Sequence, residues 1–259
     1  MAAAGGARRL ERVGIQLYTV RQQMRADMPA TIAAIAAMGY KEVEFAGYFG
    51  RTAAQVREML NSNGLASPST HIGFDAMKTN WDKTYDDALA IGQRFITVPS
   101  PPNGTTATVA SWQRVADDFN QAGERARARG LTLAYHNHGS ELRAMDGTTP
   151  FEVLVTRTDP RFVALQMDVF WTVQGGGDPM ALLRRFPDRF AMLHIKDSGG
   201  APEHRQVDVG AGTINFASLL ALDASQRGAV KHVFVEHDQP SDPMQFARTA
   251  IAHMQKLEY

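Results

Sequence analysis

Polar side chains that could bind a metal ion follow four apolar runs in the second half of the chain. The runs cover residues 131–135, 163–167, 191–193 and 232–235, and the residues directly after them are His136, Asp168, His194 and Glu236. Two imidazoles and two carboxylates are a typical ligand set for a divalent cation such as Mn²⁺, Mg²⁺, Co²⁺ or Zn²⁺. If the runs are parallel strands of one barrel, their carboxyl ends meet at one opening. The sequence therefore predicts one divalent metal ion held by these four residues.

Other polar residues are expected at the same opening. His138 lies two residues after His136, so an alternating strand would place both on one face, and either imidazole is a candidate for the fourth ligand. Glu44, within the run 42–45, and His71, directly after the run 66–70, are candidates for substrate binding.

Trp171 and Lys196 each allow a functional and a structural interpretation. Trp171, three residues after Asp168, is a candidate for stacking on a substrate, and its alternative is packing at the barrel rim. Lys196 is a candidate for binding a substrate hydroxyl or phosphate, or for stabilising an oxyanion. Its alternative is a strand-end charge paired with Asp197 or Asp208.

The elements that must position these residues follow one alternating pattern. Four earlier apolar runs, at residues 13–17, 42–45, 66–70 and 95–98, precede the four that carry the proposed ligands. Stretches of helical period separate all eight runs, which is typical of a parallel sheet built from βα units. The count and the chain length favour a single-domain (β/α)₈ TIM barrel over residues 13–259, preceded by a flexible segment at residues 1–12.

Helix boundary signals agree with this pattern. Thr52 with Gln55, and Thr149 with Glu152, have the spacing of capping boxes. Asp-Pro pairs at 178–179 and 242–243 predict two further helix starts. Glycines stand shortly before four runs, where a left-handed residue often ends a helix: Gly39, Gly64, Gly130 and Gly228.

The composition excludes several classes of protein. The 259 residues include 27 Lys+Arg and 27 Asp+Glu, so the net charge of 0 argues against nucleic acid or an anionic membrane as a partner. The absence of cysteine excludes disulfides, Fe–S clusters and a thiol nucleophile. No run reaches the roughly 18 apolar residues of a membrane helix, and the first residues lack the apolar core of a signal peptide. We expect a cytoplasmic or periplasmic protein with no leader visible in this chain.

Several segments together resemble the xylose-isomerase-like barrels of the sugar phosphate isomerase/epimerase family, which also includes inosose dehydratases and 3-keto-glycoside lyases. The matching segments are 14–21 (GIQLYTVR), 39–44 (GYKEVE), 134–138 (AYHNH), 166–171 (QMDVFW), 193–197 (LHIKD) and 235–236 (VE). The resemblance implies a carbohydrate substrate and is compatible with a homo-oligomer. It also implies a metal held by Glu, Asp, His and Glu at the ends of strands five to eight. Asp168, His194 and Glu236 match that set, whereas His136 stands where the family has Glu.

The resemblance implies a proton abstraction next to a carbonyl that a divalent ion polarises. The family's epimerases use two glutamates, and His136 removes one of them, so we expect one-base enolisation with Glu236 as the base. His138, Lys196 and Glu44 are candidates for a second proton transfer. Isomerisation or epimerisation is the expected outcome, and β-elimination by a lyase or dehydratase is the main alternative. More distant alternatives are a phosphodiesterase similar to endonuclease IV and an inactive sugar-binding barrel.

Overall fold

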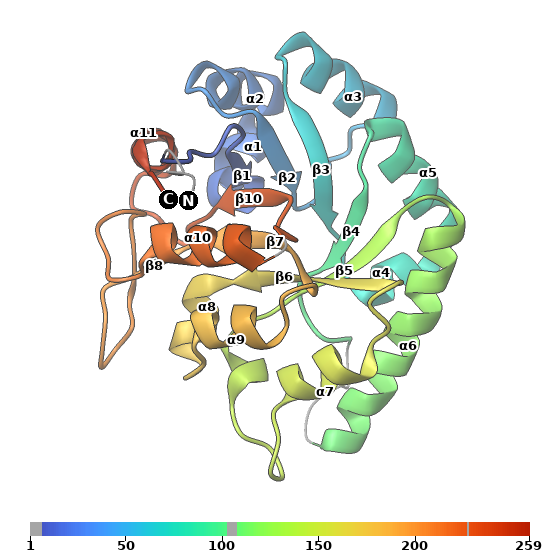
Figure 1. Cartoon of the computed structure of the whole chain (residues 1–259). Helices are drawn as coiled ribbons and strands as arrows, with labels where there is room; N and C mark the ends of the chain where they lie inside the picture. Colours follow the sequence, from blue (N-terminus) through green and yellow to red (C-terminus); the bar gives the residue numbers. More distant parts are fainter. Residues whose placement is uncertain (1–6, 103–107, 227) are drawn as a thin grey trace, which may run out of the picture.

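Eight parallel strands close into a barrel whose outer face is covered by helices (Figure 1). The computed structural model describes residues 7–102, 108–226 and 228–259. The barrel strands are β1 (Gly14–Gln16), β2 (Glu42–Phe45), β3 (Ala66–His71), β4 (Phe95–Val98), β5 (Thr132–His136), β6 (Val163–Asp168), β7 (Phe190–Ile195) and β10 (His232–Val235). Their order around the barrel is β1-β10-β7-β6-β5-β4-β3-β2. This arrangement confirms the predicted (β/α)₈ TIM barrel.

The remaining elements connect the strands. The helices are α1 (Arg21–Ala26), α2 (Met28–Ala37), α3 (Ala53–Ser62), α4 (Phe74–Thr79), α5 (Trp81–Ile91), α6 (Val109–Ala128), α7 (Pro150–Arg157), α8 (Val169–Gln174), α9 (Pro179–Arg185), α10 (Phe216–Gln226) and α11 (Pro243–Lys256). Short 3-10 helices cover Leu17–Val20 and Gly139–Leu142. A small antiparallel hairpin of β8 (Asp197–Ser198) and β9 (Gln206–Val207), which the sequence did not predict, lies outside the barrel. No helix among the described residues has both the length and the apolar character needed to cross a membrane.

Most of the predicted helix caps form. Thr52 Oγ1 accepts from Gln55 N at 3.2 Å, and Gln55 Oε1 accepts from Thr52 N at 3.0 Å, which completes the first capping box. Thr149 forms only its own half of the second box, because Glu152 Oε1 instead accepts a hydrogen bond from Arg185 at 2.5 Å. Both Asp-Pro pairs begin helices, and the four predicted glycines all have positive φ.

The interior of the barrel has an apolar layer below a polar one. Ala134, Met192 and Phe234 form a fully buried cluster inside the barrel. Because side chains alternate along a strand, the residues two positions further on face the same way. Those residues are His136, His194 and Glu236. The apolar layer therefore supports three of the predicted metal ligands from beneath.

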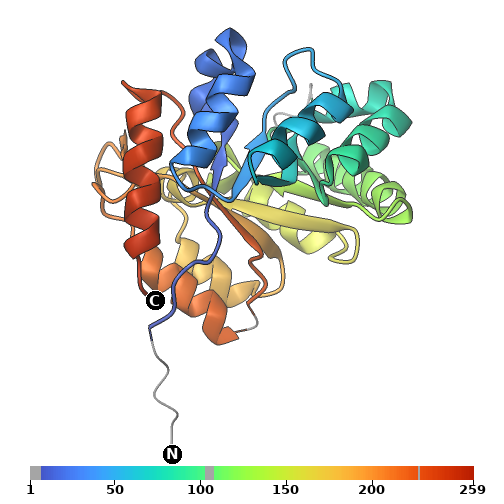
Figure 2. The ribbon, with the colours of Figure 1, turned by 90° about the horizontal axis from the view of Figure 1, so that it is seen from above.

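The two ends of the described chain lie side by side (Figure 2). Arg8 N donates to Tyr259 O, and Tyr259 N donates to Arg8 O, both at 2.9 Å. Residues 7–12, which we placed ahead of the barrel, contain no helix or strand.

Candidate functional site

A cavity of about 480 Å³ opens at the carboxyl ends of the strands. Its volume is in the range of small-molecule sites. The residues that line it are Tyr18, Ala46, His71, Pro99, His136, His138, Trp171, Lys196, Glu236, Asp238 and Gln239. Six of the nine predicted site residues are in this group. The other three, Glu44, Asp168 and His194, are fully buried and do not line the cavity.

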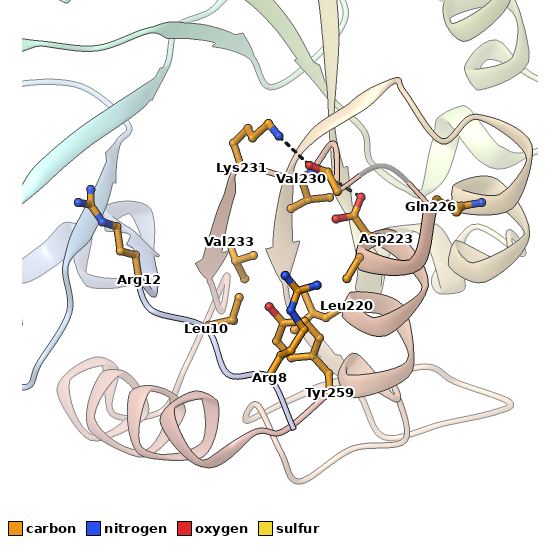
Figure 3. A pocket seen from close by; sticks show the side chains of 12 residues that line it. Arg8, Leu10, Arg12, Leu220, Asp223, Gln226, Val230, Lys231, Val233 and Tyr259 are labelled. Atoms are coloured by element: carbon orange, nitrogen blue, oxygen red, sulfur yellow. Dashed lines mark hydrogen bonds between the residues drawn. The ribbon is translucent and has the colours of Figure 1, made fainter. Parts of the chain in front are cut away.

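A second cavity, of about 400 Å³, lies beside the amino ends of β1 and β10 (Figure 3). Its lining includes Asp223 and Lys231, and both already bond to the backbone. Asp223 Oδ1 accepts from Val230 N at 3.3 Å, and Lys231 Nζ donates to Gly228 O at 2.7 Å. This cavity brings together no comparable acid–base cluster among the residues that the structure describes, so we assign the chemistry to the first cavity.

The four predicted metal ligands converge at the floor of the first cavity. Asp168, His194 and Glu236 each offer one ligand atom, and these atoms lie within 4.8 Å of one another. His136 Nε2 lies 3.7 Å from Asp168 Oδ2. Asp168 Oδ2 is buried and, among the described residues, accepts no hydrogen bond of good geometry, although the Lys196 ammonium lies 3.0 Å away. The donor set of two carboxylates and two imidazoles therefore fits a divalent cation.

Gln166 determines which nitrogen of His136 faces this cluster. Gln166 Nε2 donates to Glu44 Oε1 at 2.8 Å, so Gln166 Oε1 is the acceptor for His136 Nδ1 at 2.9 Å. Burial, together with the surrounding imidazoles, holds the pKa of His136 well below its usual value, so the ring is neutral. A neutral ring that donates from Nδ1 has its lone pair on Nε2, the nitrogen closer to Asp168. This tautomer favours His136 over His138 as the fourth ligand.

Glu44 binds the polar layer together beneath the cavity. Its Oε2 accepts from Gln16 Nε2 at 2.8 Å and lies 2.6 Å from His194 Nε2 and 3.1 Å from His71 Nε2. Burial raises the pKa of Glu44, but His71 and His194 outweigh it, so the pKa lies well below its usual value. Glu44 is therefore ionised and contacts the other site residues. Its side chain is fully buried and does not line the cavity, so the residues above it, and not Glu44 as predicted, are placed to contact a substrate.

His194 lies between two carboxylates. Its Nδ1 is 2.7 Å from Glu236 Oε2, and its Nε2 faces Glu44. Burial lowers the pKa of His194, but Glu44 and Glu236 more than offset it and raise the pKa to about 10. A carboxylate behind Nε2 is the arrangement that orients a metal-binding histidine, because it leaves Nδ1 directed at the ion.

Lys196 is buried among three carboxylates. Its Nζ lies 3.0 Å from Asp168 Oδ2 and 2.9 Å from Glu236 Oε2. The third partner is Asp238, whose Oδ1 is 2.8 Å away. Burial lowers the pKa of Lys196, but the three carboxylates outweigh it and hold the pKa above its usual value. The ammonium is therefore a permanent cation and not a proton acceptor.

The alternative for Lys196, a pair with Asp197 or Asp208, is wrong. The buried carboxylate of Asp197 instead accepts four backbone N–H groups at 2.8–3.2 Å. They belong to Ser198, Gly210, Gly212 and Ile214. A Cβ on Gly212 would lie 2.2 Å from Asp197 Oδ1, so this position must be glycine. Asp197 thus shapes the loop that carries β9.

The buried charges do not balance without a further cation. The carboxylates around the site are Glu44, Asp168, Glu236 and Asp238. The charged groups opposite them are Lys196 and protonated His194, so four negative charges face two positive ones. Burial raises the pKa of Asp168, as expected for a carboxyl that lacks enough positive charge nearby. His194 must lose its proton to bind a metal ion, so in the loaded site four carboxylates would face the Lys196 ammonium and one divalent ion, with one negative charge left over among the described residues.

Comparison with known proteins identifies the family. The chain belongs to the xylose isomerase-like TIM barrel family, whose model matches residues 32–257. The crystal structure of a sugar phosphate isomerase/epimerase from Parabacteroides distasonis has a TM-score of 0.82 and 26% identity, covering 95% of this chain and 98% of that one. The IolI protein, whose crystal structure contains a zinc atom, has a TM-score of 0.75 and 13% identity, covering 96% and 99%.

One group of curated relatives matches over a shorter span. An inosose dehydratase from Bacillus anthracis is 31% identical over 105 residues, which are 40% of this chain. The match spans 35% of that protein's length. Relatives of this family are thus sugar-modifying enzymes that include isomerases, epimerases and dehydratases.

Replacing Glu44 by glutamine should destabilise the fold. The new amide would direct a donor at side chains that are already donors, and a buried donor without an acceptor costs about 1–3 kcal/mol. The free energy of unfolding from urea denaturation measures the loss. Glu42→Gln is the matched control, because Glu42 lies on the same strand but faces fewer partners, His232 at 2.8 Å and Arg12 at 3.8 Å. Equal losses in the two variants would contradict the central position that we give Glu44.

Proposed function

We propose that this protein removes a proton next to the carbonyl of an unphosphorylated keto-sugar or cyclitol, with a divalent cation held by His136, Asp168, His194 and Glu236. The observation that carries the proposal is the buried cluster of Asp168, His194 and Glu236, with His136 beside it, beneath a cavity of about 480 Å³. Membership of a family of sugar-modifying enzymes supports it. The IolI protein, a structural neighbour that contains a zinc atom, supports the presence of a metal ion in this chain.

The charges around the cavity favour an uncharged substrate. Among the described residues that line it, Lys196 is the one lysine or arginine, and three carboxylates already surround it. A phosphate group would meet Glu236 and Asp238 without a free guanidinium or ammonium to bind it. The same argument disfavours the phosphodiesterase alternative, since a nucleic acid backbone carries one negative charge on each phosphate.

Glu236 is the base in this proposal. Burial raises its pKa, but Lys196 and His194 outweigh burial and hold the pKa well below its usual value, so the carboxylate is ionised. Its Oε2 contacts His194 and Lys196, which leaves Oε1 to accept a proton from the substrate. A divalent cation bound beside it would polarise the carbonyl and acidify the neighbouring C–H. The ammonium of Lys196 would stabilise negative charge on the substrate oxygen.

Trp171 and His138 form the wall above this floor. Their ring centroids are 5.6 Å apart, and both residues line the cavity. The indole face offers a stacking surface for the C–H groups of a sugar ring. The imidazole of His138 can return a proton to the neighbouring oxygen or carbon, which would complete an aldose–ketose isomerisation.

β-Elimination is the second candidate, and the replacement of a family glutamate by His136 favours it. A site with one carboxylate base lacks the second base that inverts a carbon, whereas elimination needs one base and one acid for the leaving group. His138 is placed to be that acid. The partial similarity to inosose dehydratase agrees with this candidate.

Product analysis by NMR in D₂O, with unphosphorylated keto-sugars, inososes and 3-keto-glycosides, tests both candidates. We expect either an isomerised product that carries solvent deuterium next to the carbonyl, or an unsaturated product that has lost the α-proton and the β-substituent. A stereo-inverted product that carries deuterium at the inverted carbon, formed at a rate that His138→Ala abolishes, would contradict the one-base mechanism. The absence of both deuterium exchange and elimination with every substrate class would contradict the proposed function.

A further inference from the structure

The ammonium of Lys196 contacts the two carboxylates that a bound metal ion would need as ligands. Asp168 and Glu236 belong to the metal-binding cluster, and their oxygens Asp168 Oδ2 and Glu236 Oε2 both lie within 3.0 Å of Lys196 Nζ. A divalent ion binds carboxylate oxygens at about 2.0–2.2 Å. An ion bound to these oxygens would therefore lie within about 5 Å of the ammonium, where like charges repel strongly in a dry site.

We propose that Lys196 is a built-in competitor of the metal ion: it neutralises Asp168 and Glu236 in the metal-free protein, and metal binding transfers its ammonium from these two carboxylates to its third contact, Asp238, alone. This inference rests on the metal site of the proposed function. It assigns Asp238 a specific task, which is to hold the displaced ammonium at the wall of the cavity.

The three contacts of Lys196 are unequal in the way that this transfer requires. The contact with Asp238 Oδ1 is a hydrogen bond of 2.8 Å, whereas the ion pair with Asp168 Oδ2 at 3.0 Å lacks hydrogen-bond geometry, and this oxygen accepts no other hydrogen bond from the described residues. The Asp238 side chain is also the most exposed of the three carboxylates, at 27%, so it adjoins the open cavity. The ring of Trp171, with its centroid 5.8 Å from Nζ, offers a further surface for the cation.

The chain holds Asp238 in place from two sides. Gln206 Oε1, on β9, accepts from Asp238 N at 3.1 Å. Arg21 Nη1 donates to Asp238 O at 2.8 Å. Asp238 is thus a fixed acceptor at the cavity wall, and the flexible side chain of Lys196 is the part that moves between it and the metal ligands.

Metal binding by variants tests the proposal without any substrate. Apo-protein is titrated with Mn²⁺, and the free ion is measured by electron paramagnetic resonance. Lys196→Met removes the competing charge and should lower the Kd for Mn²⁺ by roughly 10- to 100-fold. Asp238→Asn removes the alternative anchor and should raise the Kd about 10-fold, but this effect should vanish when Lys196→Met is also present, because the two residues act through one charge.

Controls separate competition from general disruption. Lys231→Met, at the opposite end of the barrel, should leave the Kd unchanged. Mn²⁺ should raise the Tm of Lys196→Met more than that of the unmodified protein, since a ligand stabilises the state that it binds more tightly. Lys196→Gln serves if the methionine variant does not fold, and it should also lower the Kd.

An unchanged or higher Kd in both Lys196 variants, or no binding of Mn²⁺ by either, would overturn the competition. A full effect of Asp238→Asn in the absence of Lys196 would overturn the transfer. The proposed function has a separate test: if the unmodified protein keeps its rate of deuterium exchange in the presence of EDTA, the metal-assisted reaction fails, whatever the Lys196 variants show.

Discussion

Asp168→Asn should lower the affinity for a divalent cation by at least about 100-fold while the barrel stays folded, since loss of an outer-shell partner alone costs 10–100-fold. The two oxygens of Asp168 have different tasks. Oδ2 faces the proposed metal position without a hydrogen bond, whereas Oδ1 accepts from Trp171 N at 2.9 Å and caps α8. An asparagine keeps the capping oxygen, so the variant removes the charge and the ligand strength but not the cap.

Metal content of the purified protein and calorimetric titration of the apo-protein measure this loss. Asp168→Ala should lose the metal and also about 1 kcal/mol of stability, because it removes the N-cap as well. Asp178→Asn is the matched control, since Asp178 caps α9 through Met180 N and Ala181 N at an exposed position away from the cavity. Stoichiometric metal in Asp168→Asn would refute the assignment of this carboxylate.

The barrel was predictable because parallel strands that are covered on both faces are continuous apolar runs. Strands β2, β4 and β10 have the predicted bounds. The predicted run 191–193 was too short, since β7 covers Phe190–Ile195. His194 is polar, so it ended the apolar run, yet its backbone pairs with that of Phe234 and the strand continues. The predicted end of this strand was therefore wrong because a polar site residue faces the interior of the barrel.

The polar network beneath the cavity was not predictable from single residue types. Gln16 and Gln166 read as ordinary polar positions within strands, yet they hold Glu44 and set the tautomer of His136. Their task depends on partners that lie 28 and 122 residues away in the sequence, which only barrel closure brings together.

The alternation of side chains along the strands indicates the ion-pair partner of Lys196, although our prediction did not use it. Lys196 follows His194 by two residues, and Asp238 follows Glu236 by two, so both positions continue an inward-facing series on neighbouring strands. The predicted partners of Lys196, Asp197 and Asp208, are both close to it in the sequence. The actual partner on the neighbouring strand end is 42 residues away.

Glu236→Gln should slow proton abstraction by about 10²- to 10⁴-fold, the usual contribution of a general base. The amide has nearly the volume of the carboxylate, so packing around the site is kept, but its oxygen is far too weak a base. Deuterium exchange into the substrate, measured at saturating metal and over a range of substrate concentrations, should show the loss in kcat, with a much smaller change in KM.

The Asp238→Asn variant distinguishes the loss of a base from the loss of a negative charge near Lys196. Asp238 lines the same cavity and contacts the same Lys196 ammonium as Glu236, so its replacement changes the local charge by the same amount. If the negative charge near the ammonium were all that mattered, the two variants would lose similar activity. If Glu236 accepts the proton, Asp238→Asn should lose no more than about 10-fold in kcat at saturating metal, well short of the general-base contribution. If Asp238→Asn lost as much activity as Glu236→Gln, the assignment of Glu236 as the base would be contradicted, and Asp238 at the cavity wall would be the candidate proton acceptor.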